Sequence, residues 1–430
     1  MSFDALPFLV YLLIFCFLIT RIPFFKNSSI VSWVLPLLFC TKVAVGIVYG
    51  FYFKSPILIS TADTWNFFRK SLPETQLLLH DPILFVKTIF SNKFSEVGGK
   101  LINNNSYWED LKDNIIIKML AIFNVFSMNN YFTNTIFFNF LSLFGLVAFY
   151  RLVKLYSISH QYLLLASIFL LPSFLFWGSG IHKDGLMFSA LGLIFFSFQR
   201  IIMHTGKSKH WITIILCFFF VFFVKNYLAL ALIPALLSWW LADRNQQRHE
   251  FYFIAVYSGC LLIIMLIGMT GDKYNALYYV VNRHNDYLNY YGNAALHVRP
   301  LLTNTESAIF YLPTAIDIAF FRPHPFESNN MEYLLSFIEI ALTLAITIIF
   351  IGSAKLNRLM PPFLICCLYF AFSILLLDGY IVTYSAAIVR YRSLMLPFLI
   401  TPMIALIPEK RKRRKERARG NGTQIEVKEL

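Results

Sequence analysis

Apolar stretches of about 20 residues recur along almost the whole chain, and a helix of that length is what crossing the hydrocarbon core of a bilayer requires. Of the 430 residues, 58% are hydrophobic and 14% are charged. Soluble globular proteins have about 45–50% apolar and about 25% charged residues, so a soluble enzyme, a disordered protein and a disulfide scaffold are excluded. We expect an all-α, polytopic transmembrane helix bundle with about eleven crossings, at about residues 5–22, 30–53, 131–153, 161–178, 184–203, 210–224, 227–242, 251–270, 333–354, 359–377 and 391–408.

Basic residues in the short loops predict the orientation of this bundle. If the C-terminal tail is inside, every short inside loop carries lysine or arginine, from Arg21 and Lys26 to Lys355 and Arg358. Such loops are typical of the cytoplasmic side of a membrane. We therefore expect a multi-pass protein of the cytoplasmic (inner) membrane, with its N-terminus outside and its C-terminus in the cytoplasm.

Much of the excess positive charge lies at the end of the chain. The net charge is +14, and residues 410–419 contain eight basic residues and one acid. A basic cluster after a final apolar segment binds anionic lipid with about 1 kcal/mol per residue near the surface. We expect residues 1–408 to form a single transmembrane domain and residues 409–430 a basic cytoplasmic tail, with membrane lipids and not nucleic acid as its partner.

Two long outer loops, about residues 54–130 and 271–332, hold most of the polar residues that invite a functional interpretation. The first contains LLLHDPILFVKTIF and DNIIIKMLAIFNVF, which are typical of helices lying at the membrane interface. Connections this long without structure or function are uncommon. We expect both loops to carry interfacial helices and to contribute to a site at the outer face.

Asp63 is the first candidate in these loops. It follows the second crossing in the segment ADTWNFF, next to Trp65. A carboxylate can take the proton of a sugar hydroxyl, and an aromatic ring can stack on the sugar. The alternative is that Thr61 or Asp63 caps an interfacial helix.

Two more candidates lie where pairs of apolar segments meet. The turn WGSGIHKDG contains His182, Lys183 and Asp184, and Lys225 follows FFFVFFV. A lysine there can hold a phosphate, and an unpaired base beside lipid is costly. The alternatives are a solvated turn in which Asp184 caps a helix, and a Lys225 side chain that reaches up to the interface.

Arginine and histidine side chains of the later outer segments suit bidentate binding of phosphate or pyrophosphate. In VRYR the two arginines point in different directions, so we expect at most one to face a central cavity and the other to lie at the headgroups. Salt-bridged loop residues are the alternative for the rest. The candidates are Arg283, His284, Arg299, Arg322, His324, Arg390 and Arg392. We expect Lys183, Lys225 and Arg322 to contribute to one site for an anionic lipid head.

This layout resembles the membrane glycosyltransferases of the GT-C superfamily, which have an acid in a long first outer loop. The segments PSFLFWGSGIHKDG, FRPHPFE and IVRYRSLMLP are similar to parts of bacterial polysaccharide-cluster membrane proteins. The acid here follows the second helix and not the first, and no second acid stands beside it. The resemblance implies an enzyme of cell-envelope polysaccharide or glycolipid synthesis that transfers sugar from a polyprenyl-phosphate lipid to a glycan acceptor, with Asp63 as the catalytic base.

Two other functions fit the same residues. One is an O-antigen or exopolysaccharide polymerase, which would hold a polyprenyl diphosphate with the arginines and histidines of the outer loops. The other is a transporter or flippase for a lipid-linked glycan, which would place charges along a path through the membrane. Neither a CxxC nor an HExxH motif occurs, so we expect no metal-binding residues and no cofactor besides the lipid-linked substrate.

Overall fold

The computed structural model describes residues 5–56, 58–59, 62–90, 107–158, 160–245, 248–268, 275–289, 295–325, 327, 331–353 and 360–407. The basic tail at 409–430 lies outside these residues. The described chain is helical, with a single isolated bridge between Ala295 and Tyr384. The expected all-α helix bundle is therefore confirmed.

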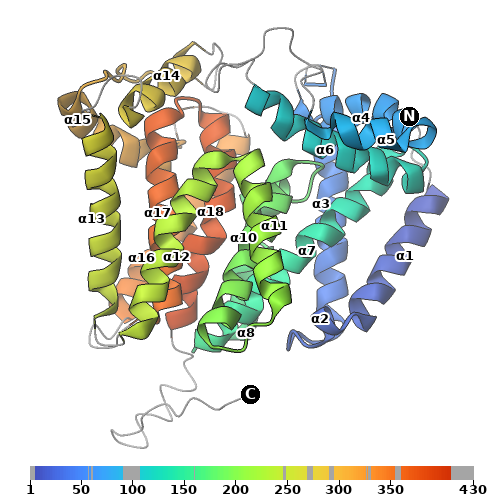
Figure 1. Ribbon diagram of the computed structural model, residues 1–430, viewed down its shortest axis with the longest axis horizontal. Helices are drawn as coiled ribbons and strands as arrows, with labels where there is room; N and C mark the ends of the chain where they lie inside the picture. The colour runs from blue at the N-terminus through green and yellow to red at the C-terminus, as the bar shows by residue number, and fades with distance from the viewer. Residues whose placement is uncertain are drawn as a thin grey trace, which may run out of the picture.

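Helices form most of the described residues of the eleven segments that we expected to cross the membrane (Figure 1). Eight of these helices are long and apolar enough to span a bilayer, and α1 and α11 are shorter apolar helices, so the number of eleven crossings stays a prediction. The helices are α1 (Ala5–Arg21), α3 (Val34–Tyr52), α7 (Tyr131–Tyr156), α8 (Gln161–Phe169), α9 (Pro172–Trp177), α10 (Lys183–Ile202), α11 (Ser208–Val224), α12 (Asn226–Arg244), α13 (His249–Gly268), α16 (Met331–Ser353), α17 (Pro362–Ile381) and α18 (Ser385–Leu406).

The expected crossing at 161–178 is divided into α8 and α9. Pro172 is the first residue of α9, and a proline there cannot donate the backbone hydrogen bond that would continue α8. The backbone N–H of Ser173 donates instead to the Glu339 carboxylate at 3.0 Å. The break brings the end of α9 and the turn after it into the interior of the bundle.

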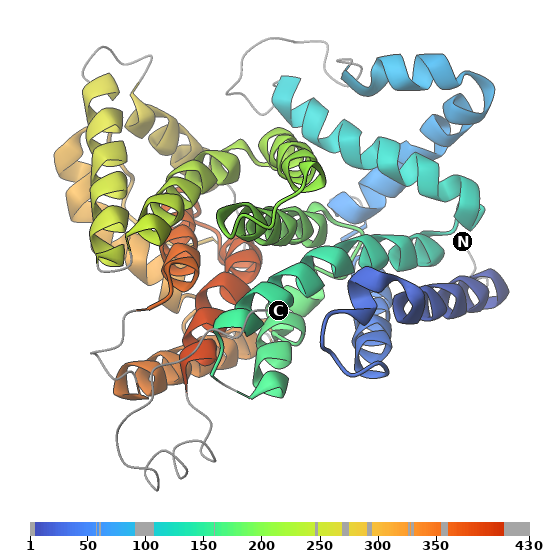
Figure 2. The same cartoon turned by 60° about the horizontal axis from the view of Figure 1, so that its bottom comes forward.

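The described parts of the two long loops fold into helices at one end of the bundle, the upper end in Figure 1, which we call the outer end after the predicted orientation. Figure 2 shows α4 and α6 lying side by side. The elements of the first loop are α4 (Asp63–His80), α5 (Pro82–Lys87), η1 (Thr88–Phe90) and α6 (Tyr107–Ser127), and those of the second are α14 (Ala276–Leu288), α15 (Thr305–Ile316) and the π-helical η3 (Asp317–Phe321). The short α2 (Pro23–Lys26) lies at the opposite end.

Buried polar pairs hold the first outer segment together. Lys118 of α6 donates to Glu74 of α4 at 2.5 Å, and both side chains are buried. Asn124 of α6 donates to Ser71 and Thr75 of α4 at 2.8 and 3.0 Å. These contacts fix α4, and with it Asp63, relative to the bundle.

Small residues allow α7 and α10 to pack closely at the centre of the bundle. A Cβ atom on Gly145 would lie 2.0 Å from the Cα atom of Ser189, and one on Gly192 would lie 2.4 Å from the carbonyl oxygen of Gly145. Between helices in lipid, close packing and polar contacts replace the hydrophobic driving force. By contrast, α13 and the spanning part of α16 are largely exposed, as expected of helices that face lipid.

Candidate functional site

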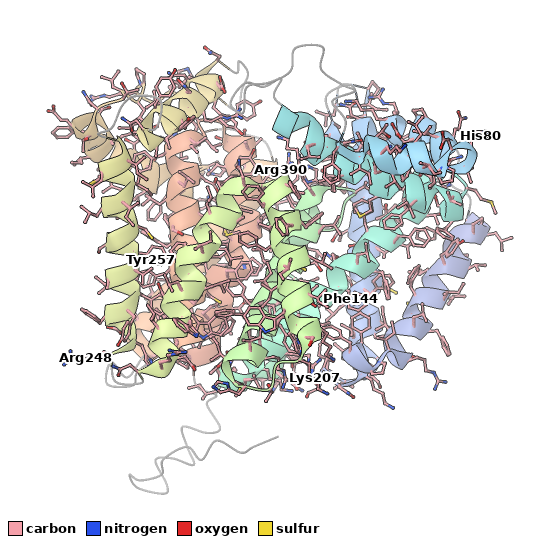
Figure 3. The ribbon with its side chains drawn as sticks, in the orientation of Figure 1. His80, Phe144, Lys207, Arg248, Tyr257 and Arg390 are labelled. Atoms are coloured by element: carbon pink, nitrogen blue, oxygen red, sulfur yellow. The ribbon has the colours of Figure 1, made fainter. Side chains whose placement is uncertain are left out.

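Charged side chains from four distant parts of the chain meet near the outer end of the bundle. The guanidinium of Arg390, on α18, reaches the Asp184 carboxylate through Nε at 3.0 Å and the Asp63 carboxylate through Nη1 at 3.4 Å. Its Nη2 atom also contacts the His182 ring. Figure 3 shows Arg390 toward the end that carries His80 and away from Lys207 and Arg248.

His182 lies between the two carboxylates. Its Nδ1 atom is 3.0 Å from Oδ2 of Asp184, and its Nε2 atom is 3.4 Å from Oδ2 of Asp63. The ring is fully buried, because His182 is the N-cap of α10 and faces inward. A ring held on both edges has one orientation, and it fixes the position of Asp63.

Lys225 completes the cluster. It occupies the single non-helical position between α11 and α12, and its Nζ atom lies 2.9 Å from Oδ1 of Asp184 and 4.9 Å from the centre of the Tyr391 ring. The alternative of a side chain reaching up to the interface is thus replaced by a paired, nearly buried lysine. We refer to Asp63, His182, Asp184, Lys225 and Arg390 as the outer charge cluster.

Asp63 is the most open of these carboxylates, with 46% of its side chain exposed. Burial alone would raise the pKa of its carboxyl, but the hydrogen bond and charge of His182 and the charges of Arg390 and Lys183 outweigh that effect. The pKa of Asp63 is therefore held well below its usual range. The carboxylate is ionised and open on one side, as a group that meets a substrate must be.

Asp63 is the first residue of α4 and Ala62 is its N-cap, so Asp63 does not cap this helix, and Thr61, the other predicted cap, lies outside the described residues. The Asp63 carboxylate instead reaches across to His182 and Arg390. Nearby, Lys183 pairs with Asp113 of α6 at 3.2 Å and lies 5.6 Å from the centre of the Phe67 ring.

Two expectations about site residues need correction. Trp65 is 4% exposed, stacks on Tyr131 at 4.1 Å and donates through its indole N–H to the carbonyl of Gly50, so its faces are not available to a sugar. Arg392 does not lie at the headgroups: it is 3% exposed and donates to the carbonyl of Arg322 at 2.6 Å. Apolar packing and backbone carbonyls hold the two side chains inside.

The arginines and histidines of the second outer loop do not join the cluster. Arg322 pairs with Asp317 at 2.9 Å and with Glu327 at 2.5 Å, and His324 pairs with Asp317 at 3.1 Å. Lys183, Lys225 and Arg322 therefore do not form one site, and all three already face carboxylates.

The remaining candidates of that loop are also dispersed. Arg283 pairs with Asp286 at 3.5 Å, and Arg299 is exposed. His284 is fully buried and bonded to the carbonyl of Tyr380, and its burial lowers the pKa of the imidazole. Arg283 and His284 therefore fit the salt-bridged or packed alternative, and Arg299 does not.

Several neighbours of the cluster were not among the predicted site residues. Asp113 pairs with Lys183, the Trp177 ring lies 5.5 Å from the Arg390 guanidinium, and Lys42 donates to the turn before His182. Trp177 and Lys42 had a signal, since one adjoins the GSGIHKD turn and the other is a charge within an apolar helix. Asp113 had none, because DLKDN is typical of any solvated helix start.

Within the described residues, no group of three or more histidine, cysteine or carboxylate side chains is arranged to hold a metal ion. The six cysteines are all free thiols. The chemistry that the arrangement offers comes from carboxylates, an imidazole and fixed cations.

Residues 134–290 match a family described as predicted membrane protein (DUF2142). The chain is a multi-pass membrane protein. The matched region includes most of α7 and all of α8 to α14, with His182, Lys183, Asp184 and Lys225, whereas Asp63 and Arg390 lie outside it. No curated protein and no solved structure matches the chain.

Proposed function

We propose that this protein is a glycosyltransferase that takes a sugar from a polyprenyl-phosphate lipid at the outer face of the membrane. The observation that carries the proposal is the half-exposed Asp63 carboxylate, held by His182 and Arg390 at the outer end of a buried charge cluster. A fixed carboxylate beside the lipid boundary suits a reaction between a lipid-linked donor and a glycan acceptor.

In this reaction the acceptor hydroxyl oxygen forms a bond to C1 of the sugar as the bond between C1 and the phosphate oxygen breaks. The polyprenyl phosphate leaves with the electron pair, and the hydroxyl proton passes to Asp63. The proton then passes from Asp63 to water through the exposed side of the carboxylate. Its main contribution is to orient the hydroxyl and accept the proton during transfer.

Lys183 is the cation best placed to meet the leaving phosphate. It lies next to the cluster, and its present partner Asp113 is a partly exposed carboxylate, with 34% of its side chain exposed. A phosphate can replace such a partner more readily than it can replace Asp184, which is buried between Arg390 and Lys225. Arg390 and Lys225 therefore keep the site in shape and Lys183 binds the lipid head.

The polymerase and transporter alternatives predict other residues. A polymerase would depend on Arg322 and His324, which lie in a separate group paired with Asp317. A transporter would depend on the charges within the bundle, Lys42 and Glu339 together with Lys225 of the cluster.

The test is release of polyprenyl phosphate from a set of polyprenyl-phosphate sugars by the purified protein in lipid nanodiscs. We expect Asp63→Asn to lower the rate by about 10²- to 10⁴-fold, which is the usual contribution of a general base, and Arg322→Gln to leave it near the parent value. Full activity of Asp63→Asn would reject the proposal. Loss of activity in Arg322→Gln alone would favour the polymerase.

A further inference from the structure

A lysine in the middle of a membrane-spanning helix contacts the turn that precedes His182 of the cluster. Lys42 is the ninth residue of the 19-residue α3, and it is 1% exposed. Its ammonium donates to the carbonyl of Gly178 at 3.0 Å and to Oγ of Ser179 at 3.2 Å. Among the described residues, no carboxylate pairs with Lys42, and both of these hydrogen bonds go to the turn that precedes His182.

The turn at residues 178–181 leads directly into His182, and it is held from several sides. Asn139 of α7 donates to the carbonyl of Ser179 at 2.8 Å. A Cβ atom on Gly46 of α3 would lie 2.4 Å from that same carbonyl, and one on Gly180 would lie 2.2 Å from the Tyr49 ring. The backbone before His182 therefore rests against α3, and only small residues permit this approach.

We infer that Lys42 is a positioning residue, which holds the 178–181 turn so that His182 and Arg390 present the Asp63 carboxylate to the substrate. A charge buried in an apolar helix is costly and is usually functional. Here the ammonium satisfies two acceptors of a non-helical turn that lies deep in the bundle, where unsatisfied backbone groups are also costly. The charge of Lys42, which a transporter would use along its path, therefore stabilises the turn next to the cluster.

This inference rests on the proposed role of Asp63, so its test has a readout that does not need transfer activity. Lys42→Met removes both hydrogen bonds and keeps an apolar side chain of similar length. Thr41→Val is the matched control, because Thr41 is the neighbouring polar residue, is only partly buried, and donates its hydroxyl hydrogen bond within α3 to the carbonyl of Leu37. Both variants are studied as the full chain in nanodiscs.

The first readout is the ¹⁵N NMR signal of the His182 ring, assigned by comparison with His182→Asn. We expect Lys42→Met to move or broaden this signal, while Thr41→Val leaves it unchanged. The second readout is transfer, for which we expect kcat to fall by about 10²-fold, a typical cost of a displaced catalytic group, with KM nearly unchanged.

Ser179→Ala removes only one of the two acceptors and covers the case in which Lys42→Met fails to fold. We expect it to change the His182 signal in the same direction by a smaller amount. An unchanged His182 signal in the folded variants would overturn the inference, whether or not transfer is observed. If the parent protein shows no transfer activity but the variants change the His182 signal, the proposed function is rejected and Lys42 is kept as the residue that positions His182.

Discussion

The Asp63 carboxylate stays ionised at neutral pH because His182, Arg390 and Lys183 hold its pKa below the usual range. A lowered pKa in the folded state adds stability above the unfolded value of about 3.9, and this stability is lost as the pH falls through the folded value. We expect the difference in thermal unfolding between the parent and Asp63→Asn to be constant above about pH 5 and to shrink below about pH 4. Thermal unfolding in nanodiscs across this range measures it. A difference that changes between about pH 6 and pH 8 would mean that another group carries the effect.

At the scale of single residues, the sequence predicted which residues belong to the site better than it predicted which of them pair with one another. Asp63, His182, Asp184, Lys225 and Arg390 were all named as candidates, because a charge next to apolar segments is costly and draws attention. Arg322 was grouped with Lys183 and Lys225, yet it pairs with Asp317 and Glu327. Pairing depends on three-dimensional neighbours that spacing along the chain does not contain.

At the scale of elements, the contact between α7 and α10 depends on glycine. We expect Gly145→Ala to destabilise the protein by about 1–3 kcal/mol, the usual cost of overpacking, because its Cβ atom would meet the backbone of Ser189 at 2.0 Å. Gly352→Ala in α16 is the control, since nothing lies within 4 Å of a Cβ atom there. Thermal unfolding of the two purified variants makes the comparison. Equal stability of both variants would show that the helices can move apart at little cost.

Also at the scale of elements, the apolar pattern predicted the helices but neither the break within residues 161–178 nor the start of α18. Each apolar segment became helix because about 20 apolar residues satisfy their backbone groups only in that way in lipid. The division of residues 161–178 follows from Pro172, and a break within an apolar segment is visible in sequence only as a single proline. The last helix, α18, begins at Ser385 and not near residue 391. Tyr391 and Arg392 therefore lie within the helix, where they contact Lys225 and the carbonyl of Arg322, and no local pattern reveals these contacts.

At the scale of the whole molecule, the helices of the two long loops share one end of the bundle and the described residues of the short basic loops lie at the other, an arrangement that is compatible with the predicted orientation. His80 and Lys207 lie at opposite ends in Figure 3, and both are exposed. We expect an impermeant maleimide to label His80→Cys in intact cells and Lys207→Cys only after permeabilisation. The parent, whose cysteines all lie within helices, gives the background. The reverse pattern would place the outer charge cluster in the cytoplasm and reject a donor from the outer face.

In the proposed function, the outer charge cluster works as one unit in sugar transfer. The most direct measurement is the single-turnover rate of polyprenyl phosphate release by the parent, Asp63→Asn, Arg390→Gln and the double variant. Groups that act together show strongly non-additive losses, so we predict that each single variant loses about 10²-fold or more and that the double variant is no slower than the slower single variant. Losses that multiply, or parent-like release by Asp63→Asn, would contradict the account.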